Sequence, residues 1–216
     1  MKVARRKYEM EARAEATAAT GERILDAAIT MFWEHPTDQI HLGDVARRAG
    51  VTVQTVIRRF GDKNGLFAAA GEREVKRVRD SRAPVTPGRL DEIVANLVAH
   101  YEELGDGVVR LLAEESRSQA LARIARQGRL VHRAWCETAF GPFLDGMAAA
   151  ERELRLAQFV ALCDVYMWKL LRRDSGLSRA QTERAILGML AALSRESTQW
   201  PRSSPIPRRR SGTSSP

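Results

Sequence analysis

A short stretch around position 55 gathers side chains that can bind nucleic acid. Thr52, Gln54, Thr55, Arg58 and Arg59 all fall within it. Gln can form paired hydrogen bonds with adenine, Arg can bind guanine or phosphate, and Thr can bind a base edge or contact a thymine methyl group. A segment that presents these side chains on one face therefore predicts contact with DNA bases.

The surrounding residues indicate two short helices that are joined by a tight turn. Apolar residues recur at helical spacing over residues 41–49, and again at Val56 and Phe60. Gly50 allows the positive φ that a sharp turn requires, and Thr52 can cap the second helix. This pattern predicts a helix-turn-helix. Such helix pairs occur in DNA-binding proteins and also in all-α proteins that bind no DNA.

The stretch from about Thr20 to Ala70 resembles the DNA-binding domain of the TetR family of bacterial transcription regulators. The segments that carry the resemblance are Ala27–Ala28, Phe32, Asp44–Thr52, Thr55–Phe60 and Asp62–Phe67. The resemblance implies an all-α protein with an N-terminal three-helix DNA-binding domain. It also implies a C-terminal helical domain that binds a ligand and dimerises.

The predicted DNA contacts lie on and around the helix-turn-helix. Side chains that we expect to face the major groove are Thr52, Val53, Gln54, Thr55, Ile57, Arg58 and Arg59, whereas His41, Arg48 and Lys63 would contact phosphates. The chain departs from the family at Ile57, where a tyrosine commonly contacts a phosphate. Ile57 cannot donate that hydrogen bond, so either Arg58 and Arg59 replace the contact or Ile57 reads a thymine methyl group.

Composition and charge favour a cytoplasmic globular protein with a basic DNA-binding end. The chain has 216 residues, 44% hydrophobic content and a net charge of +8. Its apolar runs are too short for a membrane span, and its N-terminus has no signal-peptide pattern. Two cysteines, Cys136 and Cys163, make no disulfide framework. Basic residues outnumber acidic ones in residues 1–83 and 201–216, whereas the two balance in residues 84–200.

Four segments are predicted along the chain. They are a flexible basic leader (1–19), a helix-turn-helix DNA-binding domain (20–83), a helical effector-binding and dimerisation domain (84–200) and a disordered basic tail (201–216). Pro84 and Pro87 mark the domain boundary. An alternative for the leader is a basic arm that touches DNA. Deleting Met1–Lys7 would then weaken DNA binding at low salt.

Helical patterns fill the rest of the chain, and no strand pattern appears. The expected helices cover residues 20–35, 41–49, 52–60, 62–79, 89–104, 108–115, 118–140, 152–173 and 178–195. Turns are expected at Gly105–Gly107 and Gly141-Pro142, and Gly176 is expected to end the helix over residues 152–173.

The last two helices carry apolar residues on two faces, which favours a homodimer built as a four-helix bundle. Expected interface residues are Val160, Met167, Ile186, Met189, Leu190 and Leu193. Twofold symmetry would place two reading helices on a palindromic operator. The alternative is that these helices form the buried centre of a monomer.

The resemblance also implies a small-molecule site in the second domain. Candidate lining residues are Leu97, Tyr101, Leu104, Leu111, Trp135, Phe140, Phe143, Phe159, Tyr166 and Met167, with His100, Arg110, His132 and Asp164 as polar contacts. Each aromatic residue among them also fits a plain core position. The expected effector is an apolar compound with one polar group.

These patterns predict a protein that binds double-stranded DNA, and the resemblance implies a transcription regulator, a repressor that a small molecule releases from its operator. A helix-turn-helix protein that senses a protein partner, or nothing, stays open; an apolar cavity in the second domain would argue against it, and a solid core would favour it. A third alternative is an enzyme, because His132 and Cys136 share a helical face and can bind a metal or activate a thiol. No third ligand lies beside them in sequence, so no metal or cofactor is expected.

Overall fold

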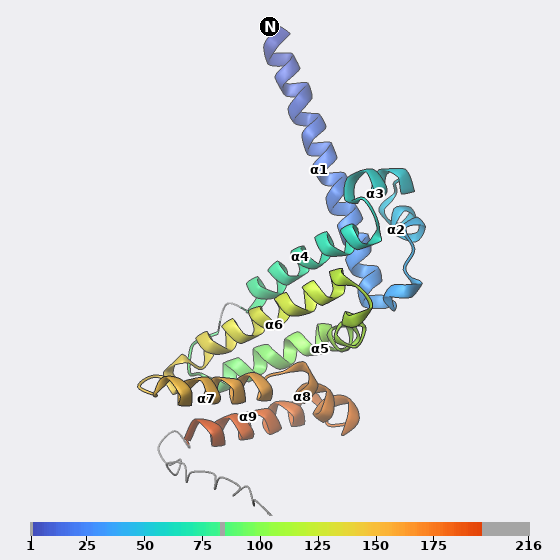
Figure 1. Ribbon diagram of the computed structural model, residues 1–216. Coiled ribbons are helices and arrows are strands. Elements are labelled where there is room, and N and C mark those ends of the chain that lie inside the picture. The colour runs from blue at the N-terminus through green and yellow to red at the C-terminus, as the bar shows by residue number, and fades with distance from the viewer. Residues whose placement is uncertain (1, 83–84, 196–216) are drawn as a thin grey trace, which may run out of the picture.

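The computed structural model describes residues 2–82 and 85–195, and all regular elements in this part of the chain are helical (Figure 1). The N-terminal elements are α1 (Lys2–Glu34), η1 (Thr37–Gln39), α2 (Leu42–Ala49), α3 (Val53–Phe60) and α4 (Lys63–Arg82). The C-terminal elements are α5 (Leu90–Glu114), η2 (Glu115–Arg117), α6 (Gln119–Ala139), η3 (Gly141–Phe143), α7 (Ala149–Leu162), α8 (Val165–Lys169), η4 (Leu170–Asp174) and α9 (Arg179–Arg195). The all-α class is therefore confirmed.

Helices α2 and α3 form the predicted helix-turn-helix. Gly50 ends α2 with a φ of 66°, in the left-handed region that favours glycine. Thr52 caps α3, because its hydroxyl accepts a hydrogen bond from the backbone N–H of Thr55 at 3.2 Å. Val45 and Val56 have no exposed surface and belong to the core of the N-terminal helices. Burial of these two residues fixes which face of α3 stays in solvent.

Helix α1 is longer than the sequence pattern predicts. It runs without a break from Lys2, and its first turns extend beyond the rest of the described chain (Figure 1). The segment is rich in Ala, Glu and Arg, which have high helix propensities. The hydroxyls of Thr17 and Thr20 bind carbonyls four residues earlier at 2.7 and 2.8 Å. Residues 2–19 thus form the start of a helix that the sequence pattern does not predict: weak amphipathicity argues against packing but not against helix formation.

The C-terminal helices surround a second core. Phe140 and Phe159 stack with their ring centroids 4.2 Å apart, and neither has exposed surface. Trp168, Ile186 and Leu156 are equally buried in the same cluster. In Figure 1, α7 and α9 lie at the end of the molecule away from α2 and α3. The helix-turn-helix and the predicted dimer helices thus lie at opposite ends.

The predicted turn at Gly105–Gly107 is wrong, because α5 continues through both glycines. Their function is close packing. A Cβ atom at Gly105 would collide with the indole ring of Trp168, and one at Gly107 would collide with that of Trp33. The glycines therefore let two tryptophans, one of them from α1, approach the backbone of α5.

The predicted helix over residues 152–173 is also wrong as a single helix. Helix α7 ends at Leu162, and Asp164 caps α8 by accepting a hydrogen bond from the backbone N–H of Tyr166 at 2.9 Å. A capping carboxylate competes with a continuous helix because it binds the N–H group that the helix would use. Gly176 has a φ of 67°, which agrees with its expected place at a helix end. The predicted tail (201–216) lies outside the described residues.

Polar contacts join the N-terminal helices to α5. The Arg110 guanidinium donates to the carbonyls of Phe32 and Trp33 at 2.7 and 2.9 Å, at the end of α1. The buried carboxylate of Glu114 accepts hydrogen bonds from the backbone N–H and the hydroxyl of Thr37, the former at 3.2 Å. These contacts fix the end of α1 to α5. No described helix combines the length and hydropathy that a membrane span requires.

Candidate functional site

The exposed face of α3 combines apolar and hydrogen-bonding side chains. Val53 and Ile57 are 39% and 41% exposed, which is unusual for large apolar residues. Gln54 and Arg58 are also exposed, and their side chains form no hydrogen bond or ion pair with another described residue. This face can contact both methyl groups and hydrogen-bonding base edges in a major groove.

Two threonines and one histidine complete the edge of this surface. The hydroxyls of Thr52 and Thr55 lie 3.0 Å apart, and Thr52 also caps the helix. His41 is the exposed residue that precedes α2, and its side chain makes no capping hydrogen bond. Its ring is therefore free to meet a ligand, whereas the hydroxyl of Thr52 already binds its own helix.

Three predicted DNA contacts are engaged within the protein. Arg59 donates to the carbonyl of Thr17 in α1 at 2.8 Å and packs against Gly21. Arg48 forms an ion pair with Glu34 at 2.7 Å, and its hydrogen bond lowers the pKa of that carboxyl group.

Lys63 also points inward. Its ammonium donates to the carbonyl of Thr37 and lies 5.6 Å from the centre of the Phe67 ring. Arg59 and Lys63 therefore hold the N-terminal helices together. Among the described residues of α3, Arg58 is the basic side chain that forms no hydrogen bond or ion pair within the protein. Helical spacing alone did not reveal this, because these contacts join residues 42 and 26 positions apart.

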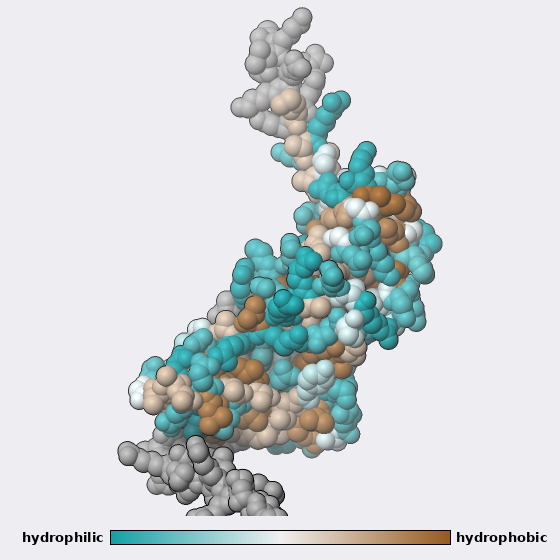
Figure 2. All heavy atoms as spheres, viewed as in Figure 1, coloured by the Kyte–Doolittle hydropathy of each residue, from teal (hydrophilic) through white to brown (hydrophobic). Residues whose placement is uncertain are grey.

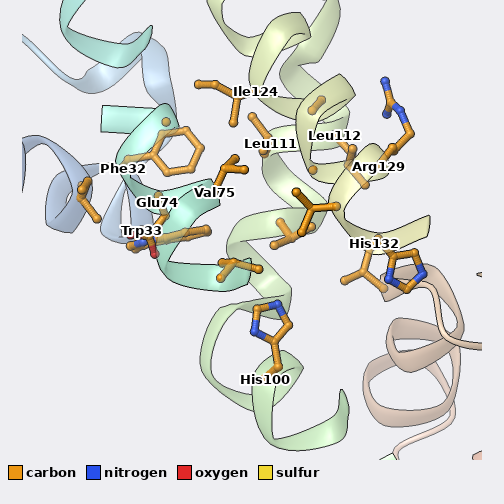
Figure 3. A pocket seen from close by; sticks show the side chains of 18 of the residues that line it. Phe32, Trp33, Glu74, Val75, His100, Leu111, Leu112, Ile124, Arg129 and His132 are labelled. Atoms are coloured by element: carbon orange, nitrogen blue, oxygen red, sulfur yellow. The ribbon is translucent and has the colours of Figure 1, made fainter. Parts of the chain in front are cut away.

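A cavity of about 150 Å³ lies between the N-terminal helices and the C-terminal domain. Its lining comes from α1, α4, α5, α6 and the start of α8. Figure 3 shows Phe32, Trp33 and Val75 on one side, Leu111 and Leu112 across from them, and His100 and His132 near one end. A mostly apolar cavity with a few polar groups is typical of small-molecule sites.

Most of the predicted effector-pocket residues are core residues instead. Tyr101 and Leu111 line the cavity as predicted. The other candidates do not: Leu97, Leu104, Trp135, Phe140 and Phe159 are buried in the protein, Phe143 and Met167 are half-buried, and Tyr166 is 49% exposed. Aromatic residues at helical spacing pack their own bundle first, and the cavity forms where two bundles meet.

Part of the cavity wall comes from the N-terminal helices, which the sequence pattern does not indicate. Phe32 and Trp33 come from the end of α1, and Phe67, Val75 and Val78 come from α4. The available signal was α4 itself, which carries apolar residues on a face that the three-helix core does not use. The sequence predicts a ligand site within residues 84–200, whereas the cavity lies between the two parts of the chain.

His100, one of the polar residues that line the cavity, is neutral. Burial, with the nearby guanidinium groups of Arg82 and Arg77, lowers the pKa of His100 to about 3. Burial raises the pKa of Tyr101 to about 12, and its hydroxyl donates to the carbonyl of Cys163 at 3.1 Å. His132 and Asp164 line the cavity as predicted, whereas Arg110 binds the end of α1 instead.

The histidine–cysteine pair does not form an open site. The Sγ of Cys136 lies 3.8 Å from the Nε2 of His132, so the predicted proximity exists. Cys136 and Cys163 have no exposed surface and do not line the cavity. A hydrogen bond to Cys136, together with burial, raises the pKa of the Cys163 thiol. The described residues hold no cluster of three metal-binding side chains.

Two predicted interface residues are unavailable to a partner. Ile186 and Leu190 have no exposed surface and pack in the core of one chain, which corrects their assignment. Val160, Met167, Met189 and Leu193 are half-buried. Exposed apolar residues instead include Leu154 at 58% and Leu170 at 54%. Figure 2 shows apolar surface on the part of the molecule where α7 and α9 lie.

Comparison with known proteins identifies the class of this fold. Residues 24–70 match the profile of bacterial regulatory proteins of the tetR family. The repressor LfrR of Mycolicibacterium smegmatis is 32% identical over 47% of this chain and 53% of its own length. The repressor KstR of Rhodococcus jostii is 29% identical over 71% of this chain and 74% of KstR. The chain spans about half the length of LfrR and of three mycobacterial regulators that it also matches.

The similarity in fold extends over most of the chain. A transcriptional regulator from Rhodococcus sp. RHA1 superposes with a TM-score of 0.66 at 21% identity, covering 84% of this chain and 99% of that one. The chain thus combines a helix-turn-helix N-terminal domain with a helical C-terminal domain. Its residues 24–70 match the tetR family profile, and its fold resembles that of a solved transcriptional regulator.

Proposed function

We propose that this protein is a sequence-specific DNA-binding transcription regulator, a repressor that a small molecule releases from its operator. The free, exposed face of α3 is the observation that carries the proposal. Its Gln54 and Arg58 side chains have no described partner, and Val53 and Ile57 expose apolar surface on the same helix that a DNA groove can cover. The names of the repressors LfrR and KstR support the same function.

In the proposed complex, α3 lies in the major groove. Gln54 and Arg58 bind base edges, while Val53 and Ile57 contact thymine methyl groups. His41 contacts a phosphate from the start of α2. The structure supports Ile57 as an apolar contact, since its side chain is exposed beside Val53. Arg58 supplies the charge on α3 itself, because Arg59 is bound to α1.

A homodimer brings two such helices to one operator. The exposed apolar residues of α7 and the half-buried Met189 and Leu193 of α9 supply a face that a second copy can cover. Gly188 in α9 has open space around its Cα, which allows another helix to approach closely. Two copies related by a twofold axis would read the two halves of a palindrome.

The proposed switch acts through the cavity. A ligand there would touch Phe32 and Trp33 at the end of α1 and Val75 in α4, as well as the opposite wall on α5 and α6. Both α1 and α4 also support α3. A change in their positions therefore moves the exposed face of α3 that we expect to contact DNA. A ligand releases DNA only if it binds the DNA-free conformation more tightly.

The alternative is a regulator that senses a protein partner, or nothing. It predicts a solid core in the second domain, and the cavity that argues against it lies at the boundary between that domain and the N-terminal helices. A cavity that is lined by apolar residues from five helices favours small-molecule sensing.

Fluorescence anisotropy on labelled DNA tests the proposal. The purified protein is titrated against the intergenic DNA beside its own gene and against random DNA of equal length, over a salt series. We expect binding to the intergenic DNA to survive physiological salt and to exceed binding to random DNA by about 10³-fold or more. Weak binding to both DNAs that salt abolishes equally would contradict sequence-specific recognition.

A further inference from the structure

A buried arginine lies at the cavity without an acidic partner. Arg82 is the last residue of α4, and its side chain is 3% exposed. Its guanidinium carbon lies 5.1 Å from the centre of the Tyr101 ring and 5.2 Å from that of Trp135. Its Nε has no hydrogen-bond partner. An unpaired buried cation is costly in a protein, so its environment needs an explanation.

No carboxylate of the described chain forms an ion pair with Arg82. Two acidic residues line the cavity with it, and each has another partner. Glu74 pairs with Arg77 at 2.6 Å, and Asp164 accepts the hydrogen bond that caps α8. The two aromatic rings and the C-terminal dipole of α4 offset part of the desolvation of Arg82. None of them supplies an acceptor for its Nε.

His132 accepts a hydrogen bond from only one of the five N–H groups of the Arg82 guanidinium. The Nη1 of Arg82 lies 3.0 Å from the Nδ1 of His132. Because arginine can only donate, Nδ1 must be the unprotonated nitrogen, and Nε2–H then donates to the carbonyl of Val160 at 3.2 Å. His132 therefore offers Arg82 one lone pair and no negative charge. His100, with its pKa of about 3, adds no negative charge either.

We propose that Arg82 binds the carboxylate of a small apolar organic acid, and that this acid is the effector. A carboxylate fits a guanidinium because both are planar and can form two parallel hydrogen bonds. The apolar cavity would hold the rest of the molecule, and about 150 Å³ accommodates roughly ten non-hydrogen atoms. The site lies at the end of α4, so the acid would bind directly to a helix that supports α3.

This inference rests on the proposed small-molecule sensing, and its test is therefore done without DNA. Isothermal titration calorimetry measures the binding of octanoate, octanamide and octylamine, which share one chain length and differ in charge. We expect octanoate to bind at least about tenfold more tightly than octanamide, and octylamine to bind most weakly. Octanoate binding no tighter than octanamide binding, or no binding of octanoate at all, overturns the proposal.

Two variants locate the effect. Arg82→Gln should reduce the preference for octanoate over octanamide to about twofold or less. Arg129→Gln is the matched control, because Arg129 also lines the cavity but pairs with Glu115 at 2.8 Å. It should keep the wild-type preference. A preference that survives Arg82→Gln, or disappears in Arg129→Gln alone, overturns the assignment. Should Arg82→Gln fail to fold by circular dichroism, the comparison of the three compounds on the wild type still decides.

Anisotropy on operator DNA then separates this inference from the proposed function. Release of bound DNA by octanoate and not by octanamide supports both. Tight operator binding with no recognition of the acid overturns only the role of Arg82. Absence of specific DNA binding overturns the proposed function, whatever the calorimetry shows.

Discussion

The reading surface on α3 and the cavity beneath it are built in opposite ways. The surface depends on local features: Gly50 turns the chain, Thr52 caps the helix and Val56 anchors it. The cavity depends on helices that are far apart in sequence, from Ile29 in α1 to Val165 in α8. Local structure can therefore be read from a short motif, whereas a cavity between helices depends on how whole elements pack.

The largest expected effect comes from a substitution that disrupts close packing between α5 and the C-terminal core. Gly105→Val should lower the free energy of unfolding by about 2–3 kcal/mol, because its side chain would collide with the buried ring of Trp168. Chemical denaturation measures the change. Gly128→Ala is the control, because nothing lies within 4 Å of its added Cβ, and it should be neutral or slightly stabilising. Equal losses in both variants would contradict close packing at Gly105.

Filling the cavity should weaken ligand binding and leave DNA binding by α3 unchanged. Gly128 lines the cavity and has open space around an added Cβ. Gly128→Leu should weaken the binding of any cavity ligand by at least tenfold, or about 1.4 kcal/mol, while DNA binding stays within about twofold of wild type. Calorimetry and anisotropy on one preparation measure both quantities. An effector that binds Gly128→Leu as it binds the wild type does not occupy this cavity.

The neutral histidine of the cavity predicts a pH dependence. Burial lowers the pKa of His100 from 6.5 to about 3, so the unfolded chain binds a proton below pH 6.5 that the folded chain does not. Stability is therefore lost as the pH falls, by about 1.4 kcal/mol between pH 7.5 and pH 5.5 from this group.

Denaturation of variants at the two pH values isolates this contribution. His100→Gln should lose about that much less stability than wild type over the same range. His35→Gln removes a histidine that lies beside Glu34 on the surface and serves as the control. An identical pH dependence of wild type and His100→Gln would show that His100 is not held neutral by burial.

Arg58 and Arg59 are adjacent on α3 but differ in their contacts: Arg59 binds α1, whereas Arg58 has no partner among the described residues. Arg59 binds the carbonyl of Thr17, so Arg59→Ala should lower the free energy of unfolding by about 1 kcal/mol. It should weaken specific and random DNA binding by similar factors, since it acts through the position of α3. A loss confined to operator DNA would show that Arg59 leaves α1 to read a base.

The sequence predicted the fold class, the helix-turn-helix and the caps at Thr52 and Gly176, because each depends on neighbouring residues. It did not predict that Lys63 points at Thr37, because that contact joins separate turns of the chain. The turn expected at Gly105–Gly107 fails for the same reason: only the positions of Trp168 and Trp33 explain why glycines occur inside a helix.

The predicted site residues on α3 agree with the structure better than those of the cavity. On α3, Gln54 and Arg58 are exposed and free, as amphipathic spacing implies. In the cavity, Tyr101 and Leu111 were predicted, whereas Phe32 and Val75 were not. Spacing along one helix indicates which face is apolar but does not indicate which other helix covers that face, or whether it leaves a gap.

The central claim is that α3 reads a DNA sequence through Arg58, and anisotropy with Arg58→Ala tests it most directly. The measured quantity is the ratio of the affinities for intergenic and random DNA at physiological salt. We expect this ratio to fall by roughly 5- to 150-fold, which corresponds to about 1–3 kcal/mol for a lost base contact. A loss of equal size on both DNAs would assign Arg58 to a phosphate, and an unchanged ratio with unchanged affinity would contradict α3 as the reading helix.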